Sequence, residues 1–425
     1  MRQRGRGVLT SAGAMIAGVV IGAVASLTLQ SLGAPPRATN GPASPRAVTP
    51  RPERSQHERS ASRVGSARIR TSGVTTSTYL AWTAGGLPDG FERRLRGLEQ
   101  IRRAVVVASD ITWMTRSISA DGTTVDEPTR PYAIPLETNA VNPAQFSAFL
   151  PQADRSDIRA ALAGGEGVLG RSSAALRHLG PGGTLEFGAQ SVRIAAVLPD
   201  ELVGASELLV SRAVGARLGA VQDRYALLQP RGAVTARRLT RLLRTILPAD
   251  LPLQVRAPGE TPYPRQGDAV LPPVKIKLLF GEFAARPDPS NPGFLDVDPA
   301  WVRAHIQIRT LPLVGKIQCN VALFPQLRGA LEELVRRGLG NLIHSEHGCY
   351  VPKFVLNDPH ASISHHAWGM AFDINLAGNE FGQPPHQDPR LVRILAKWGF
   401  LWGGRFIVPD GNHFEYRRPP ATATP

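Results

Sequence analysis

"SHHAWGMAFD" (residues 364–373) places two histidines and one aspartate in a run of otherwise small or apolar residues. Its last three residues have strand character, so Asp373 points to the opposite face from Phe372. His366 precedes a Trp-Gly turn, which lets its imidazole fold back beside Asp373. Zinc accepts imidazole nitrogen and carboxylate oxygen at about 2 Å. The stretch therefore predicts two zinc ligands, with a hydrogen-bonded structural His–Asp pair as the alternative, while His365 is expected to point away.

"DGNHFE" (residues 410–415) supplies the rest of the predicted site. His413 is the third candidate ligand, and three protein ligands leave the fourth position of a tetrahedral zinc open. Asp410, just upstream, is placed to accept a proton from water beside the metal. Glu415 is expected to orient a ligand or a loop without binding the metal itself. The two stretches together predict a zinc site with a catalytic base.

These two stretches also carry a family resemblance. The pattern S-x-H-x-x-G-x-A-x-D, followed by WGG (residues 402–404) and D-x-x-H-F-E, resembles the bacterial zinc metallopeptidases that cleave peptidoglycan stem peptides. That family comprises D-alanyl-D-alanine carboxypeptidases and L-alanyl-D-glutamate endopeptidases. The resemblance spans residues 274–418 and implies a small α+β domain whose antiparallel sheet bears the ligands, with helices on one side. It assigns the zinc-ligand and acid/base roles to the residues already named: His366, Asp373 and His413 as ligands, and Asp410 as the acid/base.

The segment GCYVPKF (residues 348–354) stands where this family usually places a Tyr and an Arg. Tyr350 and Lys353 are therefore predicted to bind substrate, and Ser364 is a third predicted substrate-binding residue. Lys353 can offer positive charge to a substrate carboxylate or oxyanion, but not the bidentate fork of an arginine. A surface lysine at a strand end is the alternative reading of Lys353.

The resemblance implies a zinc metallopeptidase that hydrolyses peptide bonds in peptidoglycan stem peptides during cell-wall remodelling. A non-catalytic cell-wall or partner-binding protein with a structural or vestigial zinc site is the alternative from another class. The spacing of the ligands does not indicate which peptide bond is cut, so carboxypeptidase and endopeptidase activities are both compatible with it.

Local patterns predict the elements of this C-terminal domain. Residues 274–283 and 311–320 are expected to be strands, and residues 342–355 to be extended. A helix is expected to begin at Asp298, with Pro299 at its first position. A second, amphipathic helix is predicted to end at Gly338. Its apolar face is expected to comprise Leu327, Ala330, Leu331, Leu334 and Val335.

The middle region, residues 75–260, predicts a mixed module with a strand at 102–114 and an amphipathic helix at 233–247. Between residues 165 and 210 it carries a G-E-x-x-L strand, a small helix, then L-x-P-G-x-T-L-x-x-G, V-x-V and E-L-L-V. This succession resembles the extracytoplasmic core domain of macrolide-exporter-type ABC-transporter permeases. The resemblance implies a binding or positioning module that could take an extracytoplasmic protein partner. Transport itself is not implied, because no ATPase motif or permease helix bundle follows.

The N-terminus resembles an export signal. Arginines at positions 2, 4 and 6 precede an uncharged stretch, residues 8–34, which exceeds the roughly 20 residues that a membrane-spanning helix needs. Arginines on this side predict an anchor that leaves the rest of the chain outside the cytoplasm. A signal peptide cleaved near residue 25, and hence a secreted protein, is the alternative. The predicted organisation is a signal anchor or signal peptide at 1–34, a disordered Pro/Ser/Arg-rich linker at 35–74, the mixed module at 75–260, a linker at 261–273, the zinc-peptidase domain at 274–418 and a tail at 419–425.

Charge and cysteine content fit an exported protein. The formal net charge of +15 is concentrated in residues 1–70, which hold eleven arginines against two glutamates, and no basic patch with interleaved aromatic residues follows. We therefore expect no nucleic-acid partner. Cys319 and Cys349 are predicted to form a disulfide, because export favours oxidation. Two reduced core thiols, or a cysteine metal ligand, are the alternatives.

Overall fold

The computed structural model describes residues 78–268 and 271–420, all of which belong to one compact unit, Arg70–Pro425. The predicted membrane segment at 1–34 and the spacer at 35–74 lie outside the described residues. Within the described residues, no helix is both long and apolar enough to cross a membrane.

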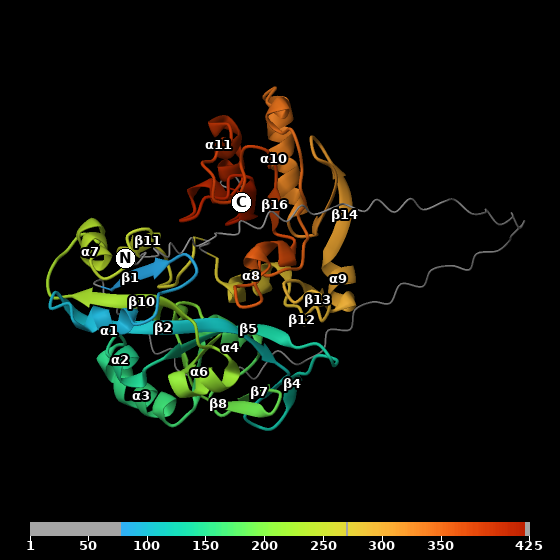
Figure 1. Ribbon diagram of the computed structural model, residues 1–425. Helices are drawn as coiled ribbons and strands as arrows, with labels where there is room; N and C mark the ends of the chain where they lie inside the picture. Colours follow the sequence, from blue (N-terminus) through green and yellow to red (C-terminus); the bar gives the residue numbers. More distant parts are fainter. Residues whose placement is uncertain (1–77, 269–270, 421–425) are drawn as a thin grey trace, which may run out of the picture. The chain divides into compact units, whose positions relative to one another are not determined.

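The middle region is built on a mixed sheet in the order β11-β1-β10-β2-β5-β9-β6-β8-β7-β3-β4. Strands β1, β10, β2 and β5 of this sheet are labelled in Figure 1. Two pairs, β5 with β9 and β6 with β8, run parallel, while the other neighbours are antiparallel. The strands are β1 Tyr79–Thr83, β2 Ile101–Met114, β3 Arg116–Ile118, β4 Thr124–Asp126, β5 Ile134–Val141, β6 Gly167–Gly170, β7 Thr184–Phe187, β8 Gln190–Leu198, β9 Leu208–Ser211, β10 Asp223–Pro230 and β11 Leu253–Arg256.

Short helices connect and cover these strands. The predicted strand at 102–114 is confirmed as β2, and the predicted helix at 233–247 as α7, which buries Leu239 and Leu243. The helices are α1 Phe91–Arg96, α2 Pro143–Ser147, η1 Gln152–Asp154, α3 Arg155–Ala163, α4 Arg171–Leu176, α5 Asp200–Val203, α6 Arg212–Leu218 and α7 Ala236–Arg244.

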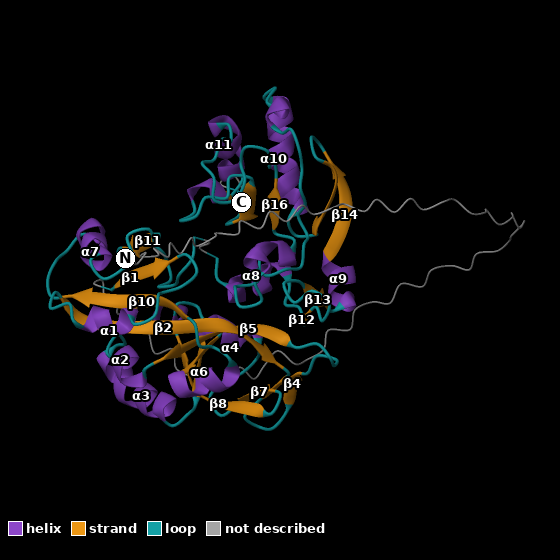
Figure 2. Cartoon of the chain, viewed as in Figure 1, coloured by secondary structure: helices purple, strands orange, loops and turns teal. Residues whose placement is uncertain are grey.

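The C-terminal region combines helices, among them α8, α10 and α11, with short strands (Figure 2). Three of its strands form an antiparallel sheet in the order β16-β18-β17, which confirms the predicted mixture of helices and antiparallel strands. One apolar core joins the helices to this sheet. The elements are α8 Pro273–Phe280, β12 Ala285–Pro287, β13 Leu295–Val297, α9 Pro299–His305, β14 Ile306–Leu311, β15 Gly315–Asn320, α10 Phe324–Arg336, η2 Gly340–Leu342, η3 Val355–Asn357, η4 His365–Trp368, β16 Ala371–Asp373, α11 Pro389–Lys397, β17 Phe400–Trp402, η5 Gly403–Arg405 and β18 His413–Tyr416.

Several predicted elements of this region are confirmed. Asp298 caps α9, because its carboxylate accepts a hydrogen bond from the Ala300 N–H at 2.8 Å. Most of the predicted strand at 311–320 is β15, and the predicted amphipathic helix is α10. Gly338, the predicted end of that helix, has a φ of +67° just beyond it.

Three local predictions were wrong. Residues 274–283 contain helix α8 instead of a strand, because Pro273 favours a helical start and the alternation fails at Leu278–Leu279–Phe280. Val335, predicted to lie on the apolar face of α10, is 50% exposed. Residues 343–354 form no continuous strand, since they are irregular, with one bend at Cys349 and isolated bridges at Glu346, Lys353 and Phe354.

Glu333 fastens α10 to α11 and makes the stability of this region pH-dependent. Its carboxylate accepts hydrogen bonds from the Lys397 ammonium at 2.8 Å, the Trp398 indole N–H at 2.7 Å and the Arg337 guanidinium at 2.7 Å. The Lys397 hydrogen bond above all lowers the pKa of Glu333 from 4.5 to about 2, although burial opposes it. Since the folded pKa lies below the unfolded one, the stabilisation is complete above about pH 4.5 and is lost as the pH falls toward 2.

We therefore expect Glu333→Gln to lower the free energy of unfolding by about 1 to 2 kcal/mol at pH 7, a modest value because Lys397 and Arg337 are half exposed and partly screened. Near pH 2.5 the difference from wild type should largely vanish. Urea unfolding at both pH values measures this, with the exposed neighbour Glu332→Gln as the control. An equal loss at both pH values would contradict the prediction.

Candidate metal centre

Strand pairing brings Asp373 and His413 together. Asp373 ends β16 and His413 begins β18, and the antiparallel register places them directly opposite each other. Residues opposite each other in such a pair point to the same face, with Cβ atoms about 5 Å apart. The pairing of strands far apart in the sequence thus sets a carboxylate beside an imidazole.

A single helical turn, η4, adds His366 to this pair. The Ser364 hydroxyl caps η4 by accepting a hydrogen bond from the His366 backbone N–H at 3.3 Å. Gly369 ends the turn with a φ of +62°, and a Cβ atom there would lie 2.6 Å from the Asn320 backbone nitrogen. The turn therefore requires glycine for both its conformation and its close approach to β15.

Three side-chain atoms form a small triangle. His366 Nε2 lies 3.2 Å from His413 Nδ1 and 3.2 Å from Asp373 Oδ1, and the last two atoms are 3.1 Å apart. Tetrahedral zinc with bonds of about 2 Å has ligands about 3.3 Å apart. The triangle therefore has the dimensions of one face of a zinc tetrahedron.

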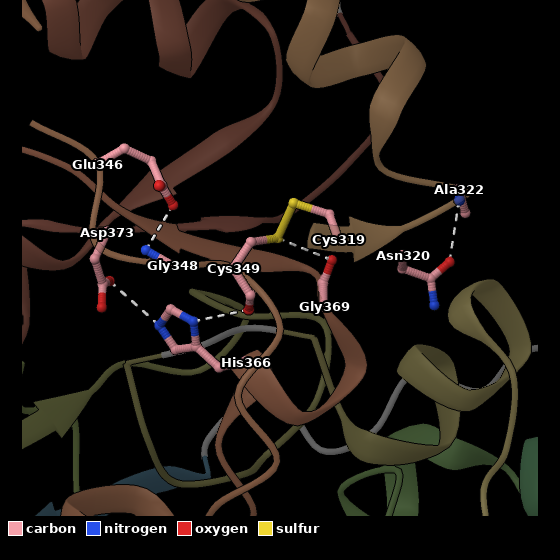
Figure 3. The surroundings of a disulfide bond; sticks show 9 residues. All are labelled: Cys319, Asn320, Ala322, Glu346, Gly348, Cys349, His366, Gly369 and Asp373. Carbon is pink, nitrogen blue, oxygen red and sulfur yellow. Dashed lines mark hydrogen bonds and ion pairs between the residues drawn. A yellow bond between two sulfur atoms is a disulfide. The ribbon is translucent and has the colours of Figure 1, made fainter. Parts of the chain in front are cut away.

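The outer contacts of both imidazoles determine which nitrogens face the triangle. His366 Nδ1 lies 3.0 Å from the backbone carbonyl of Cys349 and donates to it, since a carbonyl can only accept (Figure 3). His413 Nε2 lies 3.2 Å from the Glu415 carboxylate, which is likewise an acceptor. The inward nitrogens are thus left with lone pairs aimed at the Asp373 oxygen, and a cation satisfies all three atoms.

The disulfide supports this arrangement. Cys319 on β15 and Cys349 are bonded, with Cα atoms 5.3 Å apart, as predicted from their number and the expected export. Figure 3 shows the bond next to the carbonyl that receives the His366 N–H. Closing this loop lowers the conformational entropy of the unfolded chain, which stabilises the folded state by roughly 3 to 4 kcal/mol on the chain-entropy model.

The electrostatics of the cluster favour positive charge. Burial raises the pKa of Asp373. His366 and His413 outweigh this effect through their hydrogen bonds and their positive charge, and they hold the pKa of Asp373 well below its usual range. Burial lowers the pKa of His413, yet Asp373 and Glu415 together raise it to about 10. A proton or a metal cation can meet this demand, and metal binding displaces protons from its ligands.

Asp410 lies in the turn that leads into β18. Its carboxylate accepts a hydrogen bond from the Asn412 amide at 2.8 Å. Burial raises the pKa of Asp410, and the charge of Asp373 raises it further. Gly403 makes room for this turn, because a Cβ atom there would lie 2.6 Å from the Asp410 carbonyl oxygen and 3.1 Å from the Cβ of His413. A half-buried carboxyl with a raised pKa suits proton transfer.

The predicted substrate-binding residues have different surroundings. The positive charge of Lys353 is close enough to lower the pKa of Asp410, against the larger effect of burial. Tyr350 packs on the edge of the core, where burial raises its pKa to about 12. Ser364 is buried and caps η4, so the structure gives it a role in placing His366. A contact of these residues with substrate stays a prediction.

His365 lies outside the ligand triangle, as predicted, but the alternating strand pattern from which this was expected is wrong. The residue belongs to the helical turn η4, and its Nδ1 lies 2.6 Å from Glu415 Oε2. Glu415 in turn contacts His413, as its predicted orienting role requires. The signal that could have found His365 is the Ser-x-x-x-x-Gly frame of Ser364 and Gly369, which caps a turn at both ends.

Comparisons with known proteins address both regions. A family model described as D-alanyl-D-alanine carboxypeptidase matches residues 358–416, which include the three cluster residues and Asp410. This match agrees with the resemblance that the two motifs of the C-terminal region carry. No curated protein matched the chain.

Two solved structures show similarity. The periplasmic region of MacB from Actinobacillus actinomycetemcomitans is 13% identical, with a TM-score of 0.29, and the match covers 45% of this chain and 92% of that one. The extracellular domain of the noncanonic ABC-type transporter YknZ from Gram-positive bacteria is 16% identical, with a TM-score of 0.28, covering 42% and 99%.

Proposed function

We propose that this protein is a zinc-dependent peptidase that hydrolyses peptide bonds in peptidoglycan stem peptides. The observation that carries the proposal is the convergence of two imidazole nitrogens and one carboxylate oxygen at 3.1 to 3.2 Å, inside the segment that the carboxypeptidase family model matches. The donor set of two nitrogens and one oxygen is that of catalytic zinc sites, which keep a fourth position open.

Each residue of the centre takes one task. His366, Asp373 and His413 hold the zinc ion. When bound, zinc supplies Lewis-acid chemistry, which makes a water molecule acidic near neutral pH and polarises the scissile carbonyl. The Asp410 carboxylate accepts the proton of the attacking water and returns it to the leaving amine.

Lys353 and Tyr350 are assigned to substrate binding. The ammonium of Lys353 offers a positive charge to the carboxylate or oxyanion of a stem peptide. Peptidoglycan lies outside the cytoplasmic membrane, so this function requires an extracytoplasmic enzyme. The N-terminal arginines followed by an uncharged stretch support anchoring or secretion. The middle region then serves to position the enzyme or to bind an extracytoplasmic protein partner.

Metal content and cleavage of purified peptidoglycan test the proposal together. We expect the full chain to bind one zinc ion per molecule and to release either D-alanine or new amino termini, identified by mass spectrometry. Release of D-alanine indicates a carboxypeptidase, whereas new amino termini between L-Ala and D-Glu indicate an endopeptidase. Removal of zinc with a chelator should stop release, and added zinc should restore it.

His366→Ala should abolish zinc binding and cleavage, because it removes one of three ligands. His386→Ala is the matched control, since that imidazole is exposed on the same domain. Zinc binding without any cleavage of stem peptides would overturn the enzymatic proposal and favour a non-catalytic wall- or partner-binding protein.

A further inference from the structure

We propose that His365 is a positioning residue of the metal centre. Through Glu415, it holds the His413 imidazole in the orientation that presents Nδ1 to the metal. This inference rests on the proposed zinc peptidase and adds a residue that does not touch the metal.

One carboxylate oxygen connects the two histidines. Glu415 Oε2 lies 2.6 Å from His365 Nδ1 and 3.2 Å from His413 Nε2. Glu415 is 4% exposed and His413 8% exposed, so water competes little for these hydrogen bonds. An ionised carboxylate only accepts, and both imidazoles therefore direct an N–H toward this oxygen. The lone pair of His413 is thereby left on Nδ1, the atom in the ligand triangle.

The helical turn explains how neighbouring histidines perform different tasks. A 3₁₀ turn has three residues per turn, so consecutive side chains diverge by about 120°. His366 points into the triangle, while His365 reaches Glu415 on β18. The turn η4 therefore holds one ligand directly and a second ligand through a carboxylate. His365 and His366 are joined by a peptide bond. With a metal in place, this backbone link and the contacts through Glu415 and His413 would form a closed ring.

Loss of the His365 imidazole should weaken this ring without removing a ligand. Glu415 would lose the shorter of its two hydrogen bonds to histidine, and its carboxylate would be less restrained. His413 would then lose part of the constraint on its ring orientation. Loss of such outer contacts typically weakens metal affinity by about 10- to 100-fold. We expect an effect of this size for His365→Ala.

The test measures metal binding on the full-length protein, with three variants. His365→Ala removes the donor, His365→Asn keeps an amide N–H close to the position of Nδ1, and His386→Ala is the exposed control. The readouts are the zinc dissociation constant from chelator competition, the visible absorption spectrum of the cobalt(II)-loaded protein, and urea unfolding of the metal-free protein. We expect about tenfold or greater weakening and an altered cobalt spectrum for Ala, near-complete recovery for Asn, and wild-type behaviour for the control.

Two results would overturn the inference. One is a zinc dissociation constant for His365→Ala within about twofold of the wild-type value. The other is equal weakening in the Ala and Asn variants together with equal loss of metal-free stability, which would indicate packing alone. The proposed function fails differently: a wild type that binds zinc but cleaves no stem peptide would remove the peptidase, while a tenfold affinity gap for His365→Ala would still support positioning.

Discussion

Asp410→Asn is expected to abolish peptide hydrolysis while zinc stays bound. The asparagine has the same shape and keeps an oxygen for the Asn412 amide, which donates to Asp410 at 2.8 Å. It cannot accept the proton of the attacking water, however, and general-base catalysis contributes about 10²- to 10⁴-fold to rate. Turnover of stem peptides should therefore fall at least 10²-fold, with an unchanged zinc content and dissociation constant.

The control for this substitution is Asp358→Asn. Asp358 is exposed, lies in the same segment that the family model matches, and accepts a hydrogen bond from the His360 backbone N–H, which an asparagine oxygen can also accept. It should hydrolyse at the wild-type rate. Normal turnover by Asp410→Asn would remove Asp410 as the base, and a parallel loss of zinc would show that the residue supports the metal instead.

The second large effect is expected for Glu207→Gln, which breaks a buried network of charges. The Glu207 carboxylate lies 3.1 Å from the Arg177 guanidinium and 2.7 Å from the Lys277 ammonium, and it also accepts the Glu137 backbone N–H at 3.0 Å. Glu282 contacts the same two cations, and Asp126 lies 3.7 Å from the Arg177 guanidinium as a third acid. Arg177 and Glu207 belong to the middle region, whereas Lys277 lies on α8 at the start of the C-terminal region.

Replacing Glu207 with Gln removes the fully buried carboxylate, so that the two buried cations face only Glu282 and the more exposed Asp126. An uncompensated charge in such a site costs about 3 to 5 kcal/mol, which is a large part of the stability of an ordinary domain. The free energy of unfolding from urea titration measures the loss. Glu201→Gln, an exposed acid near the same segment, should change it by less than about 0.5 kcal/mol.

A double variant separates lost neutrality from lost packing. Lys277→Met alone should also destabilise, since it leaves Glu207, Glu282 and Asp126 with Arg177 as the one remaining cation of this network. The combination of Glu207→Gln with Lys277→Met removes one acid together with one cation. Its destabilisation should therefore be clearly smaller than the sum of the two single effects. Strict additivity would contradict the network.

The sequence by itself determined the groups that have local or chemical signatures. The spacing in SHHAWGMAFD and DGNHFE predicted the residues of the cluster, and two cysteines in a chain expected to be exported predicted the disulfide. Asp298 before Pro299 predicted the start of α9. Each of these predictions rests on residues close together in the sequence or on the chemistry of one residue type, such as cysteine. No knowledge of the fold was therefore needed.

Only the tertiary structure decided the features that depend on partners distant in the sequence. The alternation in residues 274–283 predicted a strand, but Lys277 is buried against Glu207, and α8 is the element that brings them together. His365 was predicted to point away, but it meets Glu415 because β18 pairs with β16 beside η4. A periodic pattern indicates which residues share a face of an isolated element. It does not indicate which charged or polar groups another part of the chain brings to that face. Such contacts determined the surroundings of both Lys277 and His365.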